Sequence, residues 1–360
     1  ALIDENGSPV YLTPKMDKQE EIYTQAMQYL DDAIADLQKE DLIDPEAQDL
    51  LYQGDAEKWL KLAYGLKARY TMHLLKRSAN KDADMEKVLE YVNNSFESAE
   101  EQAAFDVYDA NNINPLYGFF VARAGLGASE SMRSKLAEYN DPRLSRAFIT
   151  KQGTSGKEQA PGTADNAVYA PNGTPEQGTS KYGTSLFMYS ISAPTLLLSY
   201  HELKFLEAEA LCRLERDAKS ALKDAVVAGL LNAENSFTIS RKELGKTLIN
   251  AASSITEAEA ESYFDNTIEA KYTAEPLKTT MTQKYFALWG ASGEATESYN
   301  DVRRMKGLGE NFIELKNPNS FPLRCPYGNS DTTTNAEVKA AYGNGQYVYS
   351  ENVWWAGGSR

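Results

Sequence analysis

The spacing of apolar residues predicts helices over residues 17–95. Apolar side chains recur every three or four positions with acidic residues between them, which is the period of an amphipathic helix. Asp17 and Glu20 have the spacing of a capping box, so the first helix is expected to begin there. A second helix is expected to follow Asp55, and a third is expected over 83–94.

The same period returns over residues 195–290. A long apolar-faced helix is expected to start at Thr195, Asp217 is expected to cap the next one, and Thr256 begins a second capping box. A final amphipathic helix carries Trp289 on its apolar face. Two helices joined by a turn, with about 34 residues per pair and small residues at the crossing, are typical of a tetratricopeptide-like unit.

The segments between these regions are expected to form a loop-rich face. Residues 111–116 have the Asn and Pro content of a loop, and a short helix is predicted over 129–139. Residues 151–181 are rich in Gly, Pro, Thr and Ser, which predicts a long exposed and mobile loop. After Gly290 only short elements are expected. The predicted fold is a single mostly α domain over 1–360, with tetratricopeptide-like antiparallel helix pairs and few short β elements.

Charge and composition remove several classes of function. Lys and Arg number 37 against 52 Asp and Glu, a net charge of −15, which disfavours nucleic acid and anionic lipid as partners. Cys212 and Cys325 do not make a disulfide framework, and two histidines are too few for His-based metal chemistry. No apolar run approaches the length of a membrane span. We therefore expect no metal and no cofactor.

The sequence contains no recognisable catalytic motif. His201 and Glu202 lack the second histidine of a metalloprotease, and there is no nucleophile elbow or phosphate loop. Glu209 is expected to satisfy helix packing or a nearby arginine. The pair Arg303 and Arg304 is interpreted as structural, with the binding of a ligand carboxylate as the alternative. The prediction is a chain without catalytic residues.

Several segments, in this order and spacing, together resemble the SusD/RagB family of surface nutrient-binding lipoproteins. The resemblance covers about residues 12–356, and Asn335 and the terminal Trp354-Trp355 pair add to it. The segments are WLKLAYGLKAR at 59–69, DPRL at 141–144, LLSYHELKFLEAEA at 197–210, QKYFALW at 283–289 followed by DVRR at 301–304, and FPLRCPY at 321–327.

This resemblance implies a fold, a location and a partner. Family members are helical proteins with tetratricopeptide-like pairs, held on the outer membrane surface by an N-terminal lipid. They cap a SusC-like TonB-dependent transporter, capture glycans or in some members peptides, and perform no catalysis. The chain lacks the family's lipoprotein signal and acylated cysteine. It is therefore expected to be the C-terminal portion of a longer protein, with part of the ligand site supplied by another segment.

Loop aromatic and amide side chains are the candidates for ligand contact. Aromatic faces can stack on sugar rings, and amides can bond to hydroxyl groups. The leading hypothesis is capture of an uncharged oligosaccharide. Peptide capture, a helical-repeat adaptor with a helix-lined groove, and an enzyme with a carboxylate pair in a cleft are the alternatives. The candidate residues are Tyr108, Asn112, Asn114, Tyr117, Phe120, Tyr169, Asn172 and Tyr182.

Overall fold

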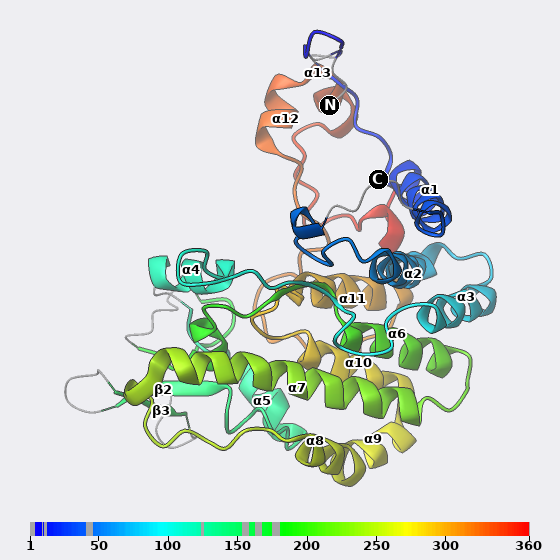
Figure 1. Cartoon of the computed structure of the whole chain (residues 1–360). Coiled ribbons are helices and arrows are strands. Elements are labelled where there is room, and N and C mark those ends of the chain that lie inside the picture. The colour runs from blue at the N-terminus through cyan, green and yellow to red at the C-terminus, as the bar shows by residue number, and fades with distance from the viewer. Residues whose placement is uncertain are drawn as a thin grey trace.

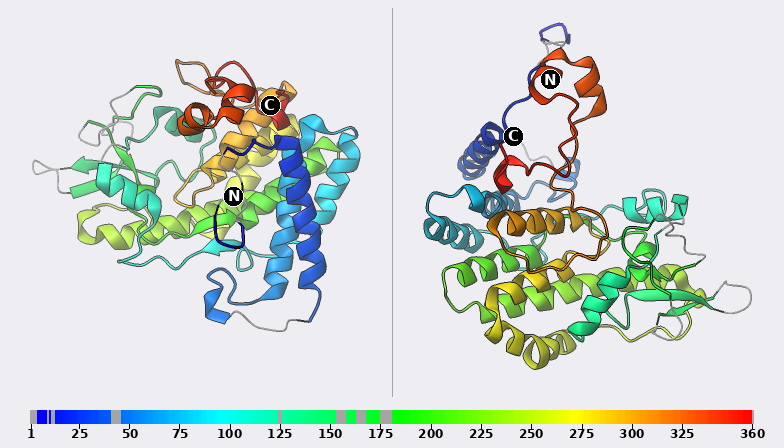
Figure 2. Two further views of the ribbon diagram at one scale, coloured as in Figure 1. Left: turned by 90° about the horizontal axis from the view of Figure 1, so that it is seen from above. Right: turned by 180° about the vertical axis from the view of Figure 1, so that it is seen from behind.

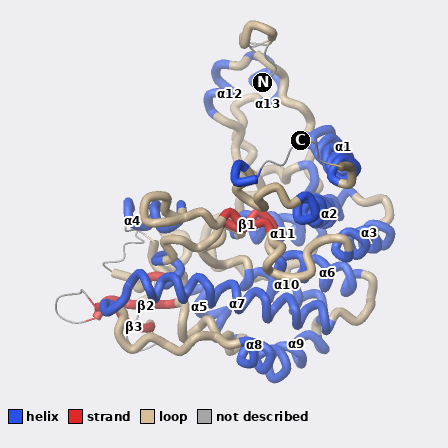
Figure 3. Tube along the Cα trace, in the orientation of Figure 1, coloured by secondary structure: helices blue, strands red, loops and turns tan. Residues whose placement is uncertain are grey.

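The computed structural model of the chain is mostly α-helical, with strands confined to two small patches (Figures 1 and 3). Helical hairpins occupy one end of the molecule, and α4 with the β2–β3 hairpin occupies the other (Figure 1). The mostly α prediction with few short β elements is confirmed. The structure describes residues 4–8, 10, 13–40, 46–123, 126–152, 158–162, 168–174 and 181–359.

The helices follow one another in short hairpins. α1 packs on α2, α2 on α3, α3 on α6, and α6 on α7 and α10. The helices are α1 (Gln19–Leu37), α2 (Ala56–His73), α3 (Lys81–Asn93), α4 (Pro115–Arg123), α5 (Glu130–Glu138), α6 (Tyr200–Arg213), α7 (Lys219–Leu244), α8 (Glu257–Tyr263), α9 (Glu269–Ala274), α10 (Pro276–Ala287), α11 (Ala295–Leu308), α12 (Asn329–Thr334) and α13 (Ala336–Tyr342).

Two small antiparallel sheets lie among the helices. β1 pairs with β5, and β2 pairs with both β3 and β4. In the part of the chain that the structure describes, neither sheet exceeds three strands, so helix packing carries the fold. The strands are β1 (Ala103–Phe105), β2 (Phe148–Gln152), β3 (Glu158–Pro161), β4 (Thr184–Ser185) and β5 (Thr195–Leu198).

Several predicted helix starts are confirmed by hydrogen bonds. The Asp55 carboxylate accepts from the Lys58 amide at 3.1 Å, and the Thr256 hydroxyl accepts from the Glu259 amide at 3.2 Å. The capping interaction expected at Asp17 lies one residue later, where the Glu21 carboxylate accepts from the Lys18 amide at 3.4 Å. The caps predicted at Asp55 and Thr256 are thus confirmed, and the one at Asp17 is displaced by one residue. Asp217, expected to cap α7, lies just before the N-cap Ala218, and its carboxylate accepts from the Lys219 amide at 3.0 Å.

The expected helix start at Thr195 is wrong. Residues Thr195–Leu198 form β5, and α6 begins at Tyr200, where the Ser199 hydroxyl accepts from the Glu202 amide. Leu196 and Leu198 are buried while Leu197 is 48% exposed, which is the alternation of a strand. Gly65 on α2 permits this packing, because a Cβ there would lie 2.4 Å from Leu198 Cδ2.

Two further expectations need correction. The 14-residue helix α11 follows Gly290, where only short elements were expected. Its buried face includes Asp301 and Arg304, so few of its buried positions are apolar. The segment 151–181 also contains structure, since Ile149 to Gln152 of β2 pair with Pro161 to Glu158 of β3. The expected mobility of this segment stays a prediction for the residues that the structure does not describe, which are 153–157, 163–167 and 175–180.

The C-terminal part includes a small lobe that rises from the helical body (Figure 2). α12 and α13 form this lobe, and Asn335 between them donates to the Pro14 carbonyl oxygen at 2.7 Å. The terminal pair serves packing, because Trp355 is buried against His73 with ring centroids 5.7 Å apart. Trp354 lies under the Arg77 guanidinium, whose carbon is 5.0 Å from the ring centroid.

A buried ion-pair network joins α6 to α11. Arg304 donates to Glu209 Oε2 at 2.8 Å and to Asp301 Oδ1 at 2.7 Å, and Arg213 donates to Glu209 Oε1 at 2.8 Å. Burial alone would raise the pKa of Glu209. The guanidinium groups of Arg304 and Arg213 outweigh burial and hold that pKa well below its usual range. Lys284 completes the network, 2.8 Å from Asp301 Oδ2.

Substituting Arg304→Ala should strongly destabilise the protein. The change leaves the buried Glu209 and Asp301 carboxylates short of a cation, which costs about 3–5 kcal/mol in comparable buried pairs. Urea denaturation followed by circular dichroism measures the free energy of unfolding. Arg216→Ala is the control, because its Glu86 partner and its own side chain are each 50% exposed. Equal losses in the two variants would contradict the assignment of the network as a structural centre.

Candidate binding site

A cleft of about 500 Å³ opens on the loop-rich end of the molecule. We call it the loop-face cleft. It lies between the start of α4, the segment before α5, and the turn that links α10 to α11. Its lining residues are Asn114, Pro115, Leu116, Leu126, Gly127, Ala128, Ser129, Ser185, Met188, Thr195, Trp289, Gly290, Ala291, Gly293 and Ala295.

Asn114 ties three segments together at one wall of the cleft. Its side-chain amide donates to the carbonyl oxygens of Ala193 at 2.8 Å and Ala291 at 3.3 Å. Its side-chain oxygen accepts from the amides of Leu116 at 2.8 Å and Tyr117 at 3.3 Å, which caps α4. Asn114 is 1% exposed, so its polar atoms serve the protein itself and fix the shape of the wall.

The opposite wall is built by backbone pairing. The Ala128 amide donates to the Gly183 carbonyl oxygen, and the Ala170 amide donates to that of Ala128, each at 2.8 Å. Ser129 caps α5, and its hydroxyl lies 3.0 Å from Asn172 Oδ1. This wall therefore takes its position from Ala170 and Asn172, inside the Gly-rich segment 151–181, and from Gly183 just after it.

Trp289 provides the aromatic surface of the cleft. Its ring lies 5.5 Å from Phe148 and 5.0 Å from Phe187, which hold it in place, and its side chain is partly exposed. Trp289 and Ala295 also line a neighbouring hollow of about 270 Å³, whose other lining residues include Tyr285, Tyr299 and Phe321. The two hollows thus share an aromatic residue at their boundary.

The described lining of the cleft contains no ionisable side chain. Among the described residues that line it, the polar ones are Asn, Ser and Thr. A glycosidase-type carboxylate pair is therefore not present in the described lining. The described residues also contain no group of three or more His, Cys, Asp or Glu that could hold a metal.

The buried carboxylates are engaged in ion pairs elsewhere. Burial raises the pKa of Glu202, even though Arg69 donates to both of its oxygens. Burial would also raise the pKa of Glu297, but the hydrogen bond from His73 at 2.8 Å and the positive charges of His73, Arg69 and Lys284 together outweigh burial and lower the pKa to about 2. These shifted groups belong to the helical interior and do not line the loop-face cleft.

The candidate residues from the sequence form two groups, one at 108–120 and one at 169–182, and the loop-face cleft has residues near both. Asn114 lines it directly. Tyr108 lies behind one wall, where its hydroxyl is 2.9 Å from Oγ1 of the lining residue Thr195. Asn172 lies behind the opposite wall, where its side-chain oxygen is 3.0 Å from the hydroxyl of the lining residue Ser129. The structure therefore brings parts of both groups to one place, although none of the candidate tyrosines is a lining residue.

The other candidates lie farther from the cleft. Phe120 and Tyr182 are 7% and 8% exposed, which makes them part of the core edge. The Tyr117 hydroxyl donates to Glu243 at 3.0 Å, and Tyr169 packs on Phe148 with ring centroids 5.3 Å apart. Asn112 is exposed and bonds to Asp109 within its own loop.

The residue that sequence reasoning missed as a cleft residue is Trp289. Its place on the apolar face of a helix indicated core packing, and half of that interpretation holds, because one side of the ring does contact Phe148 and Phe187. α10 ends at Ala287, so Trp289 lies in the turn that follows the helix. The signal that could have revealed its second role is Gly290, which follows it directly. An aromatic residue at a helix end beside a glycine turn can reach the surface.

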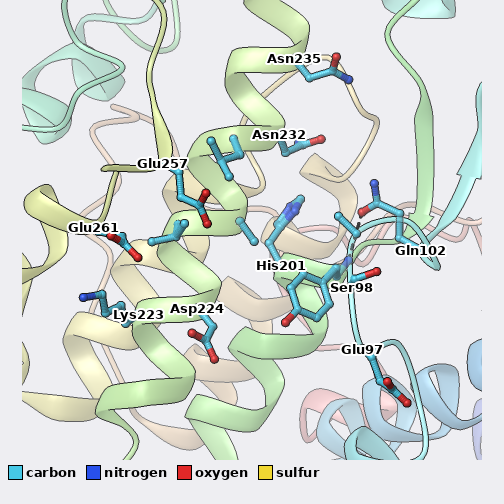
Figure 4. A pocket seen from close by; sticks show the side chains of 15 residues that line it. Glu97, Ser98, Gln102, His201, Lys223, Asp224, Asn232, Asn235, Glu257 and Glu261 are labelled. Carbon is cyan, nitrogen blue, oxygen red and sulfur yellow. Dashed lines mark hydrogen bonds between the residues drawn. The ribbon is translucent and has the colours of Figure 1, made fainter. Parts of the chain in front are cut away.

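A second hollow lies on the helical side of the molecule (Figure 4). We call it the helix-lined groove; it has a volume of about 440 Å³. α7 passes along it, α8 and the segment before β1 form its sides, and the start of α6 closes it. Its lining residues are Glu97, Ser98, Ala99, Gln102, Tyr200, His201, Lys223, Asp224, Val227, Ala228, Leu231, Asn232, Asn235, Glu257 and Glu261.

Comparison with known proteins identifies the family. The model of the SusD-like family described as starch-binding and associating with the outer membrane matches residues 4–327. A search of curated protein sequences finds no match. No helix among the described residues is long and apolar enough to cross a membrane.

Solved structures agree with this family. A SusD/RagB family protein from Bacteroides thetaiotaomicron is 67% identical over 97% of this chain and 75% of its own, with a TM-score of 0.93. A chitin-binding protein is 21% identical over 96% of this chain and 74% of its own, with a TM-score of 0.67. A SusD homologue from Bacteroides fragilis is 19% identical over 95% and 76%, with a TM-score of 0.71. The two more distant structures show a shared fold, and the family match shows that this chain belongs to the SusD/RagB family of outer-membrane-associated nutrient-binding proteins.

Proposed function

We propose that the chain captures an oligosaccharide at the loop-face cleft and delivers it to a SusC-like TonB-dependent transporter at the cell surface. The observation that carries this proposal is the pairing of the Trp289 face with serine and threonine hydroxyl groups in a cleft whose described lining has no ionisable side chain. An uncharged, hydroxyl-rich ligand suits that surface. The volume of the cleft, about 500 Å³, falls within the range of roughly 300–1,000 Å³ found for small-molecule sites.

The cleft is open and shallow, so weak binding is expected. Little ligand surface is desolvated in such sites, and affinities from millimolar to micromolar correspond to about 4–8 kcal/mol. Membership of a binding, non-catalytic family supports capture without turnover. Calorimetry with starch, chitin and other oligosaccharides tests the proposal, and peptides in the same panel test the peptide-capturing alternative. Hydrolysis of any sugar by the pure protein would refute the non-catalytic assignment.

Substituting Ala295→Tyr should abolish or strongly weaken oligosaccharide binding. Ala295 is exposed in the first turn of α11 and lines both the cleft and the neighbouring hollow, so a larger side chain fills the space without removing a core contact. Ala83→Tyr is the matched control, because Ala83 is exposed in the first turn of α3. Calorimetry measures both variants with the best-binding oligosaccharide. Unchanged affinity of Ala295→Tyr would place the sugar site elsewhere.

Substituting Asn114→Ala should lower both stability and sugar affinity. The change leaves the buried carbonyl oxygens of Ala193 and Ala291 without their donor, which costs about 1–3 kcal/mol, and it frees the start of α4 that forms one wall. Thermal unfolding and calorimetry provide the two measurements. Asn112→Ala is the control, because that side chain is exposed two residues away. Similar behaviour of the two variants would show that Asn114 does not organise the cleft.

A further inference from the structure

The helix-lined groove is long and has two differently built sides. Its lining runs along α7 from Lys223 to Asn235, 12 positions apart, which is about 18 Å at 1.5 Å per residue. Figure 4 shows Glu257 and Glu261 on one side and Gln102 on the other. A span of this length accommodates about five extended peptide residues at roughly 3.3 Å each.

The lining of the groove is strongly acidic. Four of its side chains are carboxylates, and its one cation, Lys223, already donates to both oxygens of Asp265 at 2.9 and 3.0 Å. Glu97 and Asp224 have only long ion pairs, at 3.5 Å to Lys61 and 3.6 Å to Lys204. Glu257 and Glu261 are exposed and form no ion pair within the described part of the chain.

The rest of the groove lining is aliphatic or carries side-chain amides. Val227, Ala228 and Leu231 give α7 an aliphatic strip between the charged groups. The Gln102 side-chain oxygen accepts from the Tyr200 amide at 3.2 Å, which leaves its NH₂ group for a ligand. Asn232 donates to the Ser292 hydroxyl at 3.3 Å, which leaves its oxygen.

Amide side chains placed in this way can pair with a peptide backbone. An NH₂ group donates to a peptide carbonyl oxygen, and an amide oxygen accepts from a peptide N–H. Asn235, exposed at the end of the groove, adds a further amide of both kinds. The described lining has two aromatic rings, Tyr200 and the buried His201, whereas a sugar site relies on broader stacking surfaces such as Trp289 in the loop-face cleft. The lining therefore favours a peptide over a glycan.

We propose that the helix-lined groove binds an extended peptide segment that carries Lys or Arg side chains. The carboxylates receive the cationic groups, the aliphatic strip of α7 contacts their methylene stems, and the amides bond to the peptide backbone. This site shares no lining residue with the loop-face cleft, so it does not depend on the sugar-capture proposal.

Calorimetry with two synthetic hexapeptides tests the proposal. One is capped at both ends and carries three Lys residues, and the other is identical except that each Lys is acetylated. The Lys peptide should bind about tenfold more tightly, and its affinity should fall as salt is raised from 50 to 500 mM, because exposed ion pairs are screened. Glu257→Gln/Glu261→Gln should reduce its affinity by about tenfold, since each exposed pair accounts for roughly a threefold to fivefold change.

Asp82→Asn/Glu90→Gln is the matched control. It removes two exposed acids from one face of α3, with the same change in net charge, and should leave peptide affinity unchanged. Equal binding of both peptides, or an equal loss in the two double variants, would overturn the proposal. Binding of a chitosan tetrasaccharide with no binding of the Lys peptide would overturn it in favour of an amino-sugar site. Oligosaccharide binding at the loop-face cleft, measured on the same variants, should stay unchanged.

Discussion

The ion pair between Glu209 and Arg304 is the contact on which the arrangement of the helices depends. Both side chains are fully buried, and neither would be stable in the interior alone. Asp301, Arg213 and Lys284 supply the remaining partners, so the charges are balanced within the network. The pair joins α6 to α11, and Ala295, the first residue of α11, lines the loop-face cleft. The pair therefore fixes the position of the helical hairpins relative to the cleft.

A second buried pair positions the aromatic surface of that cleft. Asp141 and Arg143 bond to each other through two contacts of 2.8 and 2.6 Å, and Arg143 also donates to the Phe286 carbonyl oxygen at 2.7 Å. Phe286 lies near the end of α10, three residues before Trp289. The apolar binding surface is therefore held in place by polar contacts beneath it. This explains why the segment DPRL is informative in the sequence although none of its residues lines the cleft.

Two elements show where sequence patterns fail. The apolar character of residues 195–198 predicts a helix start, but these residues pair with β1 as strand β5. α11 was not predicted, because two of its four buried residues, Asp301 and Arg304, are charged. The candidate site residues stay a prediction, and several of them are buried for a related reason. Loop tyrosines and amides such as Tyr182 and Asn114 have the composition of a binding surface, but burial is set by contacts between distant segments. Sequence spacing does not record those contacts.

The loop-face cleft and the helix-lined groove differ in the charge of their described linings. A net charge of −15 is compatible with a cleft whose described lining is neutral, because the acids are gathered elsewhere, four of them around the helix-lined groove. The overall potential disfavours anionic ligands at both places. Within that limit, the proposed sugar site would select by stacking and hydroxyl contacts, and the proposed peptide site would select by charge. Because salt screens charge interactions far more than stacking, ionic strength would distinguish the two proposed sites.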